Sequence, residues 1–399
     1  MDALMLPLNW QRVRLGDIAE IKRGASPRPI ENPKWFCANS NVGWVRISDI
    51  SKNSRFLYKT AQKLSKKGIE KSRFIKQNSL IMSMCATIGK PIITKIDTCI
   101  HDGFVVFENP KIDLNYLYYF LCYIEKEWLE SGQQGSQVNL NVDLIKNKEV
   151  FYPKDLNEQI AIANILSDVD HYLYSLDALI LKKESVKKAL SFELLSQRKR
   201  LKGFNQNWQR VRLGDICEFG NGGAYETLIV ENGNFKLISL NSIDIDGNLK
   251  NTMKRVNFYD NSLKQDDIVM VLSDVAHGDF LGLCAVIPSN DYVLNQRMGR
   301  LRKRNDCINI LFLRLYINAN QKYFKMQGQG SSQLNLSKKA IEDFEILLPP
   351  LNEQIAIANI LSGLDNEITS LKNKKRQFEN IKKALNHDLM SAKIRVLKK

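Results

Sequence analysis

The segment LNEQIAIANILS occurs twice in the chain, starting at Leu156 and again at Leu351. Three further stretches repeat in the same order: NWQRVRLGDI at Asn9 and Asn207, GQQGSQVNL at Gly132 against GQGSSQLNL at Gly328, and VKKALSFELL at Val186 against IKKALNHDLM at Ile381. The spacing between copies stays between 195 and 198 residues. A spacing this regular indicates a length-conserving duplication. We therefore expect two related halves, so that one chain imitates a dimer.

The stretches between the shared segments differ almost completely. Residues from about Arg23 to Ser131 show little similarity to those from Gly220 to Gln327. Both regions mix short β-rich runs, such as GWVRISDI and FKLISLNSIDI, with helical runs such as DLNYLYYFLCYIEKEWLE. Each variable region is therefore predicted to be an α+β domain of roughly 150 residues.

A long helix is predicted after each variable region, because apolar residues recur there in alternating steps of four and three. Each helix is expected to run for roughly 40 residues, or about 60 Å. One such helix would expose its apolar seam, whereas two can cover each other as an antiparallel pair. The alternative is two separate core helices of two similar domains. The residues expected to pair the helices are Leu166, Val169, Leu173 and Leu176 in the first, and Leu361, Leu364, Ile368 and Leu371 in the second.

The expected fold class is thus α+β. Two variable domains, residues 1–155 and 202–350, are separated by two long antiparallel coiled-coil helices, residues 156–201 and 351–399. On this prediction, an aspartate at Leu166 or Leu361 would break the helix pair and leave the domain cores intact.

The charge balance favours an anionic partner. The chain has 399 residues, with 58 Lys plus Arg against 43 Asp plus Glu, a net charge of +15. Nucleic acid is the commonest partner of so basic a chain, and the alternative is a basic protein without such a partner. Seven scattered cysteines form no CxxC pair, which argues against a zinc site or a disulfide framework and favours reduced thiols. No signal peptide and no apolar run long enough for a bilayer is evident, so we expect a cytoplasmic protein with no membrane contact.

Motifs of common catalytic sites are missing from the sequence. There is no GxxxxGK[ST] phosphate loop, no GxGxxG, no HExxH and no GxSxG. The tetrapeptide with which amino-methylating enzymes hold a flipped base is also missing, since LPPL at Leu348 has a leucine on each side of its prolines. We therefore expect no catalytic residue, no metal site and no cofactor in this chain.

Basic and amide-rich stretches are the remaining candidates for a functional surface. Lys and Arg neutralise phosphates, Arg can pair bidentately with guanine, and Asn or Gln can pair with adenine. EIKRGASPRP at Glu20 is expected to be a loop that follows the repeated lead strand. The candidate DNA contacts are Lys22, Arg23, Arg28, Lys52, Lys90, Gln133, Gln137 and Asn139 in the first half, and Asn295, Gln296, Arg297, Arg300, Gln329, Gln333 and Asn335 in the second.

Structural roles compete with these assignments. A basic run is often only a solvated surface. The shared SQxNL sequence precedes Asn141 and Ser337, which are good N-caps for short helices, so a structural role and a DNA contact both remain open for it. Sequence preference must lie mainly where the two halves differ, because identical residues cannot produce two different recognitions.

The order of motifs resembles the specificity subunit of type I restriction–modification systems. The resemblance rests on WxxVxLGDI at Trp10 and Trp208, GxxSQxNL, and LNEQIAIANILS with its long helix, each present twice, and it covers essentially the whole chain. It implies that each variable region is a target recognition domain for one half of a split, asymmetric sequence in double-stranded DNA. It also implies that the helices set the gap between the half-sites and dock two methyltransferase subunits.

The resemblance places the chemistry in the partners. Methylation of adenine N6 with S-adenosylmethionine would belong to the methyltransferase subunits, and ATP- and Mg-dependent cleavage to restriction/translocase subunits. The chain itself would be a non-catalytic DNA-recognition subunit. The alternative functions are a fused enzyme and a scaffold that does not bind DNA. The resemblance also explains why LNEQIAIANILS occurs twice, since two copies of one partner would be held.

Overall fold

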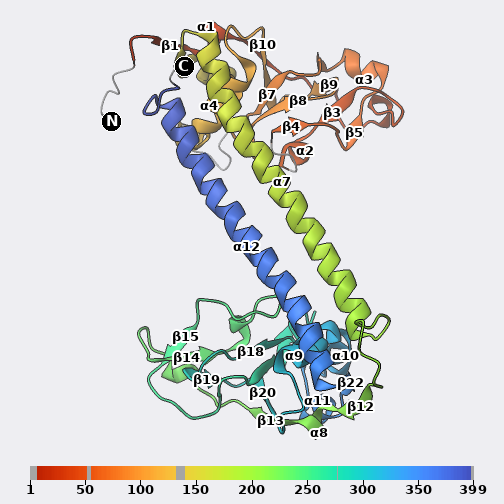
Figure 1. Cartoon of the computed structure of the whole chain (residues 1–399). Helices are drawn as coiled ribbons and strands as arrows, with labels where there is room; N and C mark the ends of the chain where they lie inside the picture. Colours follow the sequence, from red (N-terminus) through yellow and green to blue (C-terminus); the bar gives the residue numbers. More distant parts are fainter. Residues whose placement is uncertain (1–6, 52–54, 132–139, 276, 397–399) are drawn as a thin grey trace. The chain divides into compact units, whose positions relative to one another are not determined.

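The computed structural model describes residues 7–51, 55–131, 140–275 and 277–396 (Figure 1). The chain divides into two compact units. The first unit comprises Met1–Asp177 and Lys374–Lys399, and the second comprises Ala178–Asn373. Each unit is described by itself below. No helix among the described residues is both long and apolar enough to cross a membrane.

The described residues of the first unit form three sheets and several short helices. In the two-stranded sheet, β1 (Trp10–Arg14) pairs antiparallel with β11 (Glu149–Pro153). The five-stranded sheet has the order β2 (Glu20–Arg23), β10 (Phe104–Glu108), β7 (Leu80–Ser83), β8 (Pro91–Thr94) and β4 (Phe56–Leu57). The four-stranded sheet has the order β5 (Gln62–Lys63), β3 (Gly43–Val45), β9 (Thr98–Ile100) and β6 (Arg73–Ile75). The helices are α1 (Leu15–Ile18), η1 (Pro33–Trp35), α2 (Ile47–Ser51), α3 (Lys66–Glu70), α4 (Leu114–Tyr123), α5 (Glu125–Ser131) and α6 (Val142–Asn147).

The second unit repeats this plan with different lengths. β12 (Gln209–Arg212) pairs with β22 (Glu345–Leu348), as β1 pairs with β11. A four-stranded sheet has the order β13 (Cys217–Asn221), β20 (Met298–Lys303), β16 (Ile268–Val271) and β18 (Cys284–Val286). Two smaller sheets contain β15 (Lys254–Val256), β14 (Phe235–Ile238) and β19 (Tyr292–Leu294), and β17 (Ser273–Val275) with β21 (Gln333–Asn335). The helices are α8 (Leu213–Ile216), η2 (Glu226–Leu228), η3 (Leu240–Ser242), α9 (Ile310–Ala319), α10 (Gln321–Gln327) and α11 (Lys338–Glu342).

The two predicted long helices are present, and each has 40 residues. They are α7 (Leu156–Leu195) and α12 (Leu351–Met390). Within the first unit, Lys375 pairs with Asp177 at 2.6 Å and Lys382 with Asp170 at 2.5 Å. Because one residue number rises as the other falls, this pairing is antiparallel.

The second unit shows the same antiparallel direction between its own portions of the two helices. There Lys183 pairs with Glu367 at 2.8 Å, and Lys187 pairs with Asp365. The mixed α+β class and the paired long helices predicted from the sequence are therefore confirmed.

The predicted seam is only partly a helix–helix contact. Leu166 is fully buried in the core that α7 shares with α4 and the sheets of the first unit, and Leu361 is fully buried in the core of the second unit. Leu176 and Ile368 are 5% and 6% exposed, and Val169, Leu173, Leu364 and Leu371 are half-buried. The expectation that Leu166→Asp and Leu361→Asp would spare the domain cores is therefore wrong. The heptad pattern could not reveal this, because one apolar stripe serves both a partner helix and a domain core.

Candidate nucleic-acid interface

Residues shared by both repeats build the same frame in each unit. The indole Nε1 of Trp10 donates to Glu158 at 3.4 Å, and that of Trp208 donates to Glu353 at 3.0 Å. In the second unit the Arg200 guanidinium also donates to the buried Glu353 carboxylate, at 2.6 and 3.1 Å. The glutamate of LNEQ therefore ties the start of each long helix to the lead strand of its own unit.

The glutamine of LNEQ has an equally internal role. Gln159 is buried, accepts from the backbone amide of Asp113 at 2.8 Å and donates to the carbonyl of Pro153 at 2.8 Å. Gln354 repeats this with the amide of Asn309 and the carbonyl of Pro349, both at 2.8 Å. Asp113 and Asn309 are the N-caps of α4 and α9. Glu and Gln of the repeated segment are thus explained by contacts within each unit, whatever the partners.

Each unit also contains a parallel strand pair whose ends meet at one place. β3 runs parallel to β9 with Val45 opposite Ile100, and β14 runs parallel to β19 with Ile238 opposite Leu294. Arg46 and His101 come directly after the first pair, and Ser239 and Asn295 directly after the second. We call this place the loop corner. It comprises residues 46–48, 85 and 101–103 in the first unit, and 239–241, 273–274, 295–297 and 333–335 in the second.

Matched backbone contacts establish that the two loop corners correspond. The amides of Ala25 and Gly223 donate to the carbonyls of Ile100 and Leu294, both at 3.1 Å. The preceding glycines, Gly24 and Gly222, admit a close backbone approach. An ideal Cβ on Gly24 would lie 2.0 Å from the carbonyl oxygen of His101, and one on Gly222 would lie 2.1 Å from that of Asn295.

Two further contacts extend the correspondence to the neighbouring strands. Met84 donates to the carbonyl of Gly103 at 2.8 Å, and Leu272 to that of Arg297 at 3.0 Å. Leu140 in turn donates to Met84 at 3.0 Å, as Leu336 does to Leu272 at 2.8 Å. The backbone frame of the loop corner is therefore the same in both units, whereas its side chains differ.

In the second unit the loop corner surrounds a cavity of about 480 Å³. Arg297 and Gln333, both predicted as DNA contacts, line it together with Asn241 and Lys250. Arg297 is exposed and lies in the left-handed region with φ +67°. Among the described residues its guanidinium has no hydrogen bond and no ion pair. The structure thus brings together two predicted residues that are far apart in the sequence, around a cavity that Lys250, Arg297 and the Asp274 carboxylate line.

The other predicted residues of the second unit differ in whether their side chains are exposed and unpaired enough to contact DNA. Asn295 is 2% exposed, and its amide is used by the backbone of Tyr225 and by Glu226. Arg300 lies on β20, where it pairs with Glu218 at 2.6 Å. Both side chains therefore stabilise the fold, and we do not propose them as DNA contacts. Gln296 is exposed but donates to Glu226, Gln329 is exposed, and Asn335 lies on β21 and accepts from Ser273.

The shared SQxNL sequence precedes the helix caps that were expected. The Asn141 side chain accepts from the amide of Leu144 at 2.7 Å, and that of Ser337 from the amide of Ala340 at 3.2 Å. In the second copy Gln333 to Asn335 form strand β21, because they pair with β17. The N-cap prediction is confirmed for α6 and α11, and it leaves Gln333 free for another role.

In the first unit the basic stretch after the lead strand is not a loop. Lys22 and Arg23 belong to β2, which pairs with β10, so the turn begins only at Gly24. Lys22 pairs with Glu108 at 2.5 Å and Glu20 at 2.9 Å, and the hydrogen bond to Glu108 raises the pKa of the Lys22 ammonium. Arg23 and Arg28 both contact Asp102, through its carbonyl at 2.7 Å and its carboxylate at 2.8 Å. These two arginines therefore brace the loop corner.

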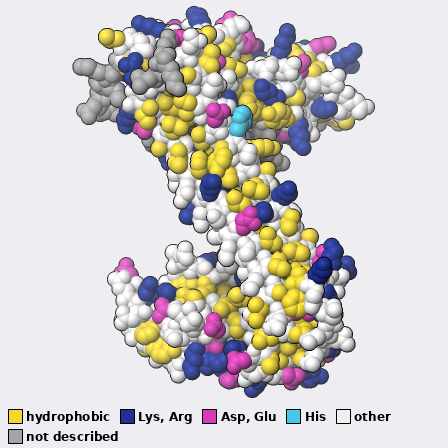
Figure 2. All heavy atoms as spheres, in the orientation of Figure 1, with side chains coloured by type: hydrophobic (Ala, Val, Ile, Leu, Met, Phe, Trp, Pro, Cys, Tyr) yellow, Lys and Arg dark blue, Asp and Glu magenta, His cyan; other side chains and the backbone are white. Residues whose placement is uncertain are grey.

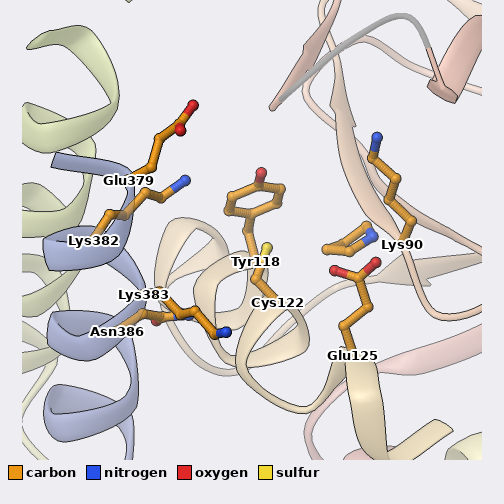
Figure 3. A pocket seen from close by; sticks show the side chains of 9 residues that line it. Lys90, Tyr118, Cys122, Glu125, Glu379, Lys382, Lys383 and Asn386 are labelled. Carbon is orange, nitrogen blue, oxygen red and sulfur yellow. The ribbon is translucent and has the colours of Figure 1, made fainter. Parts of the chain in front are cut away.

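Lys90 lies in a different setting. It lines a cavity of about 290 Å³ in the first unit, opposite Lys382, Lys383 and Asn386 of α12 (Figure 3). Tyr118 and Glu125 complete much of the wall, and burial raises the pKa of Glu125. The cavity contains both cations and carboxylates, so it does not single out an anionic ligand. Four predicted contacts, Lys52, Gln133, Gln137 and Asn139, lie outside the described residues.

Sequence reasoning missed Arg46, His101 and Asn241. None of them lies in a basic or amide-rich run. A weak signal was available, because Arg46 and His101 each directly follow a short β-rich run, GWV and TCI. Only the parallel pairing of these strands shows that the two residues lie side by side.

Comparisons with known proteins agree with this organisation. A family model described as the type I restriction modification DNA specificity domain matches residues 7–183 and again residues 205–380. The type I restriction enzyme MjaVIII specificity subunit of Methanocaldococcus jannaschii is 26% identical, over 99% of this chain and 95% of that one. A putative type I restriction enzyme MjaX specificity subunit of the same organism is 23% identical, over 98% and 95%.

Solved structures share the fold. The crystal structure of the type I restriction–modification S subunit from M. genitalium matches with a TM-score of 0.64 at 17% identity, over 96% of this chain and 98% of that one. A chain from a structure on complex assembly and conformational transition of the type I R-M system matches with a TM-score of 0.60 at 16% identity, over 96% and 98%. With the family model matched twice, the chain belongs to the type I restriction–modification DNA specificity family and is a non-catalytic specificity subunit.

Proposed function

We propose that the variable regions, residues 1–155 and 202–350, each read one half of a split, asymmetric DNA sequence. The observation that carries this proposal is the loop corner, which has one backbone frame and two sets of side chains. A common frame suits the common geometry of duplex DNA, and different side chains suit different bases. Two unlike reading surfaces need no palindromic target, in contrast to the half-sites of a symmetric dimer.

The long helices, within residues 156–201 and 351–399, are proposed to set the unspecified gap between the half-sites. Both helices continue without a break across the boundary between the units, α7 at Asp177 and α12 at Asn373. A continuous helix rises about 1.5 Å per residue and so provides a stiff spacer. The ion pairs between the two long helices and their buried seam residues support this role.

Two methyltransferase subunits are proposed to dock on the repeated segment. Its Glu and Gln point into each unit, but apolar residues of both copies remain exposed. Leu156 and Ile160 are 53% and 38% exposed, and their counterparts Leu351 and Ile355 are 36% and 37% exposed. Figure 2 shows hydrophobic side chains at the surface of the long helices. Two equal apolar surfaces fit two copies of one partner, because equal partners need equal contacts.

The chemistry would be supplied by these partners in the cytoplasm. Methyltransferase subunits would transfer a methyl group from S-adenosylmethionine to adenine N6, and restriction/translocase subunits would use ATP and Mg. The chain itself contributes the choice of sequence. Its net charge of +15 supports contact with phosphates, which predicts DNA binding that weakens steeply with salt.

The decisive experiment is methylation mapping. The chain is expressed with its methyltransferase in a host free of adenine methylation, and the modified adenines are sequenced. We expect a split motif with a fixed gap that disappears when the chain is omitted. A soluble, assembled complex that methylates nothing and binds DNA without salt dependence would instead indicate a scaffold.

The docking proposal has its own test. Ile160→Asp should remove one of two methyltransferase subunits, and Ile160→Asp with Ile355→Asp should remove both, as counted by native mass spectrometry. Leu181→Asp is the matched control, because Leu181 is 64% exposed on the same helix while its counterpart Arg376 is already charged. If the double variant still binds two subunits, the docking surface lies elsewhere.

A further inference from the structure

The loop corner of the first unit contains a cation whose charge is not neutralised. Arg46 is exposed and directly follows β3. Its guanidinium donates to the amide oxygen of Gln62 at 3.0 Å, a neutral acceptor. No carboxylate forms an ion pair with it among the described residues. Arg46 is therefore held in place at one end while it keeps its full charge.

The neighbouring cations, unlike Arg46, form ion pairs or hydrogen bonds to backbone carbonyls. Arg28 pairs with the Asp102 carboxylate at 2.8 Å, and Lys22 pairs with Glu108 and Glu20. The Nε of Arg23 donates to the backbone carbonyl of Asp102. The carbonyl of Arg23 in turn accepts from Nε of Arg73. These residues stabilise the corner, whereas Arg46 has donors to spare for a ligand.

His101 lies next to Arg46 and is fixed in orientation. Its ring packs edge-on against Phe104, with centroids 4.6 Å apart, and 6.0 Å from the ring of Trp44. Its Nδ1 accepts from the amide of Gly103 at 2.8 Å, so the neutral ring carries its proton on Nε2. Burial lowers the pKa of His101, which favours this neutral form. The side chain is 19% exposed, so the ring is not fully enclosed by the protein.

The second unit shows what this position can hold. His101 corresponds to Asn295 and Gly103 to Arg297, through the matched contacts of Ala25 and Met84 with their counterparts. The free arginine thus comes from the loop after β19 in the second unit and from the loop after β3 in the first. Among the described residues, each loop corner presents one guanidinium that forms no ion pair, but from a different strand of the parallel pair.

We propose that Arg46 and His101 are specificity-determining residues for the half-site read by the first variable region. The assignment rests on the proposed function and names the residues that carry it out. An arginine that is held at one end and forms no ion pair with a neighbouring carboxylate can pair bidentately with O6 and N7 of guanine. Because Nδ1 is occupied as an acceptor, the remaining Nε2–H of His101 is a donor, which suits the major-groove acceptors of a neighbouring base, namely purine N7, guanine O6 or thymine O4.

The test compares the methylation motifs of five complexes, the wild type and four variants, each of the full chain with its methyltransferase. Arg46→Ala should relax one guanine position in one half-site, with preference for the native base reduced roughly 10- to 100-fold. Arg46→Lys should relax it too, because lysine keeps the charge but lacks the bidentate geometry. His101→Asn, which introduces the residue of the second unit, should relax one adjacent position. Lys111→Ala is the control, since Lys111 is an exposed cation beyond the far end of β10.

The outcomes separate this inference from the function on which it rests. If the wild-type complex produces no split motif, the proposed function fails. If it does, and Arg46→Ala and His101→Asn keep every base of the motif, the inference is overturned. A uniform loss for Arg46→Ala that Arg46→Lys restores would mark a phosphate contact and would also overturn it. Unfolding temperatures of the variants, measured alongside, distinguish a lost contact from a lost fold.

Discussion

Substitution of Gly24 by alanine should damage one loop corner and spare the other. The added Cβ would lie 2.0 Å from the His101 carbonyl oxygen and 2.6 Å from that of Ile100. Both obstacles are backbone atoms, so no side-chain rotation can relieve the clash. The chain after β2 must move away from β9, which weakens the hydrogen bonds of Gly24 to Phe104 at 2.9 Å and of Ala25 to Ile100 at 3.1 Å.

The magnitude follows from these contacts. Overpacking costs about 1–3 kcal/mol, and each of the two weakened backbone hydrogen bonds adds about 0.5–1.5 kcal/mol, for a total of roughly 2–6 kcal/mol. In a unit of this size, 1 kcal/mol shifts the unfolding temperature by about 2–4 °C. We therefore expect the first unit of Gly24→Ala to unfold about 4–24 °C lower than that of the wild type.

Calorimetry and methylation mapping provide the assay. Gly24→Ala should relax one half-site, and Gly222→Ala, with its Cβ 2.1 Å from the Asn295 carbonyl oxygen, should relax the other. Gly363→Ala is the control, because its Cβ meets nothing within 4 Å. That change, inside helix α12, should stabilise the protein by about 0.5–1 kcal/mol. Wild-type stability and an unchanged motif in Gly24→Ala would refute the close approach.

Three further predictions concern single side chains. Arg297→Ala or Gln333→Ala should relax one base of the half-site opposite to that of Arg46, by about 1–3 kcal/mol if a base contact is lost, as read from the methylation motif. An equal loss on every sequence would indicate a phosphate contact. Leu361→Ala should destabilise the second unit by about 2–5 kcal/mol in thermal unfolding, because Leu361 is fully buried in its core; a loss below 1 kcal/mol would contradict that placement. Stability should also fall as pH drops below 6.5, since burial lowers the folded-state pKa of His101 from that value and the neutral ring is favoured in the folded state. The slope in this range should be weaker in His101→Asn, measured as the free energy of unfolding against pH; Asp102, whose pKa is lowered from 3.8, acts only at more acidic pH.

The duplication and the long helices could be predicted from local sequence. Identity between Asn9 and Asn207, and between Leu156 and Leu351, is visible in the residues themselves. A 40-residue helix needs only a sustained apolar period and few breakers, which are properties of neighbouring residues. The N-caps at Asn141 and Ser337 depend on a side chain and an amide three residues away, so they too could be predicted.

Local sequence could not reveal what each apolar residue of those helices packs against. The heptad pattern treats Leu166, Leu176 and Leu361 alike, yet Leu166 and Leu361 lie in domain cores. Ile381 follows the same pattern and is 50% exposed. An apolar period identifies a buried stripe without identifying what covers it, because that depends on which elements pack there.

Only the tertiary structure could show which side chains meet at the loop corner. Arg46 and His101 are distant in sequence and meet because β3 and β9 pair in parallel, an arrangement with no local signature. Gly24 and Met84 reach the same place because β2 and β7 both pair with β10. Residue type alone favoured Lys22 and Asn295, which the fold uses for ion pairing and for internal hydrogen bonds. It overlooked Arg46, since a single arginine after a short strand carries no pattern until its neighbours are known. The sequence by itself thus determined two units on one frame, while strand pairing determined which side chains each unit presents.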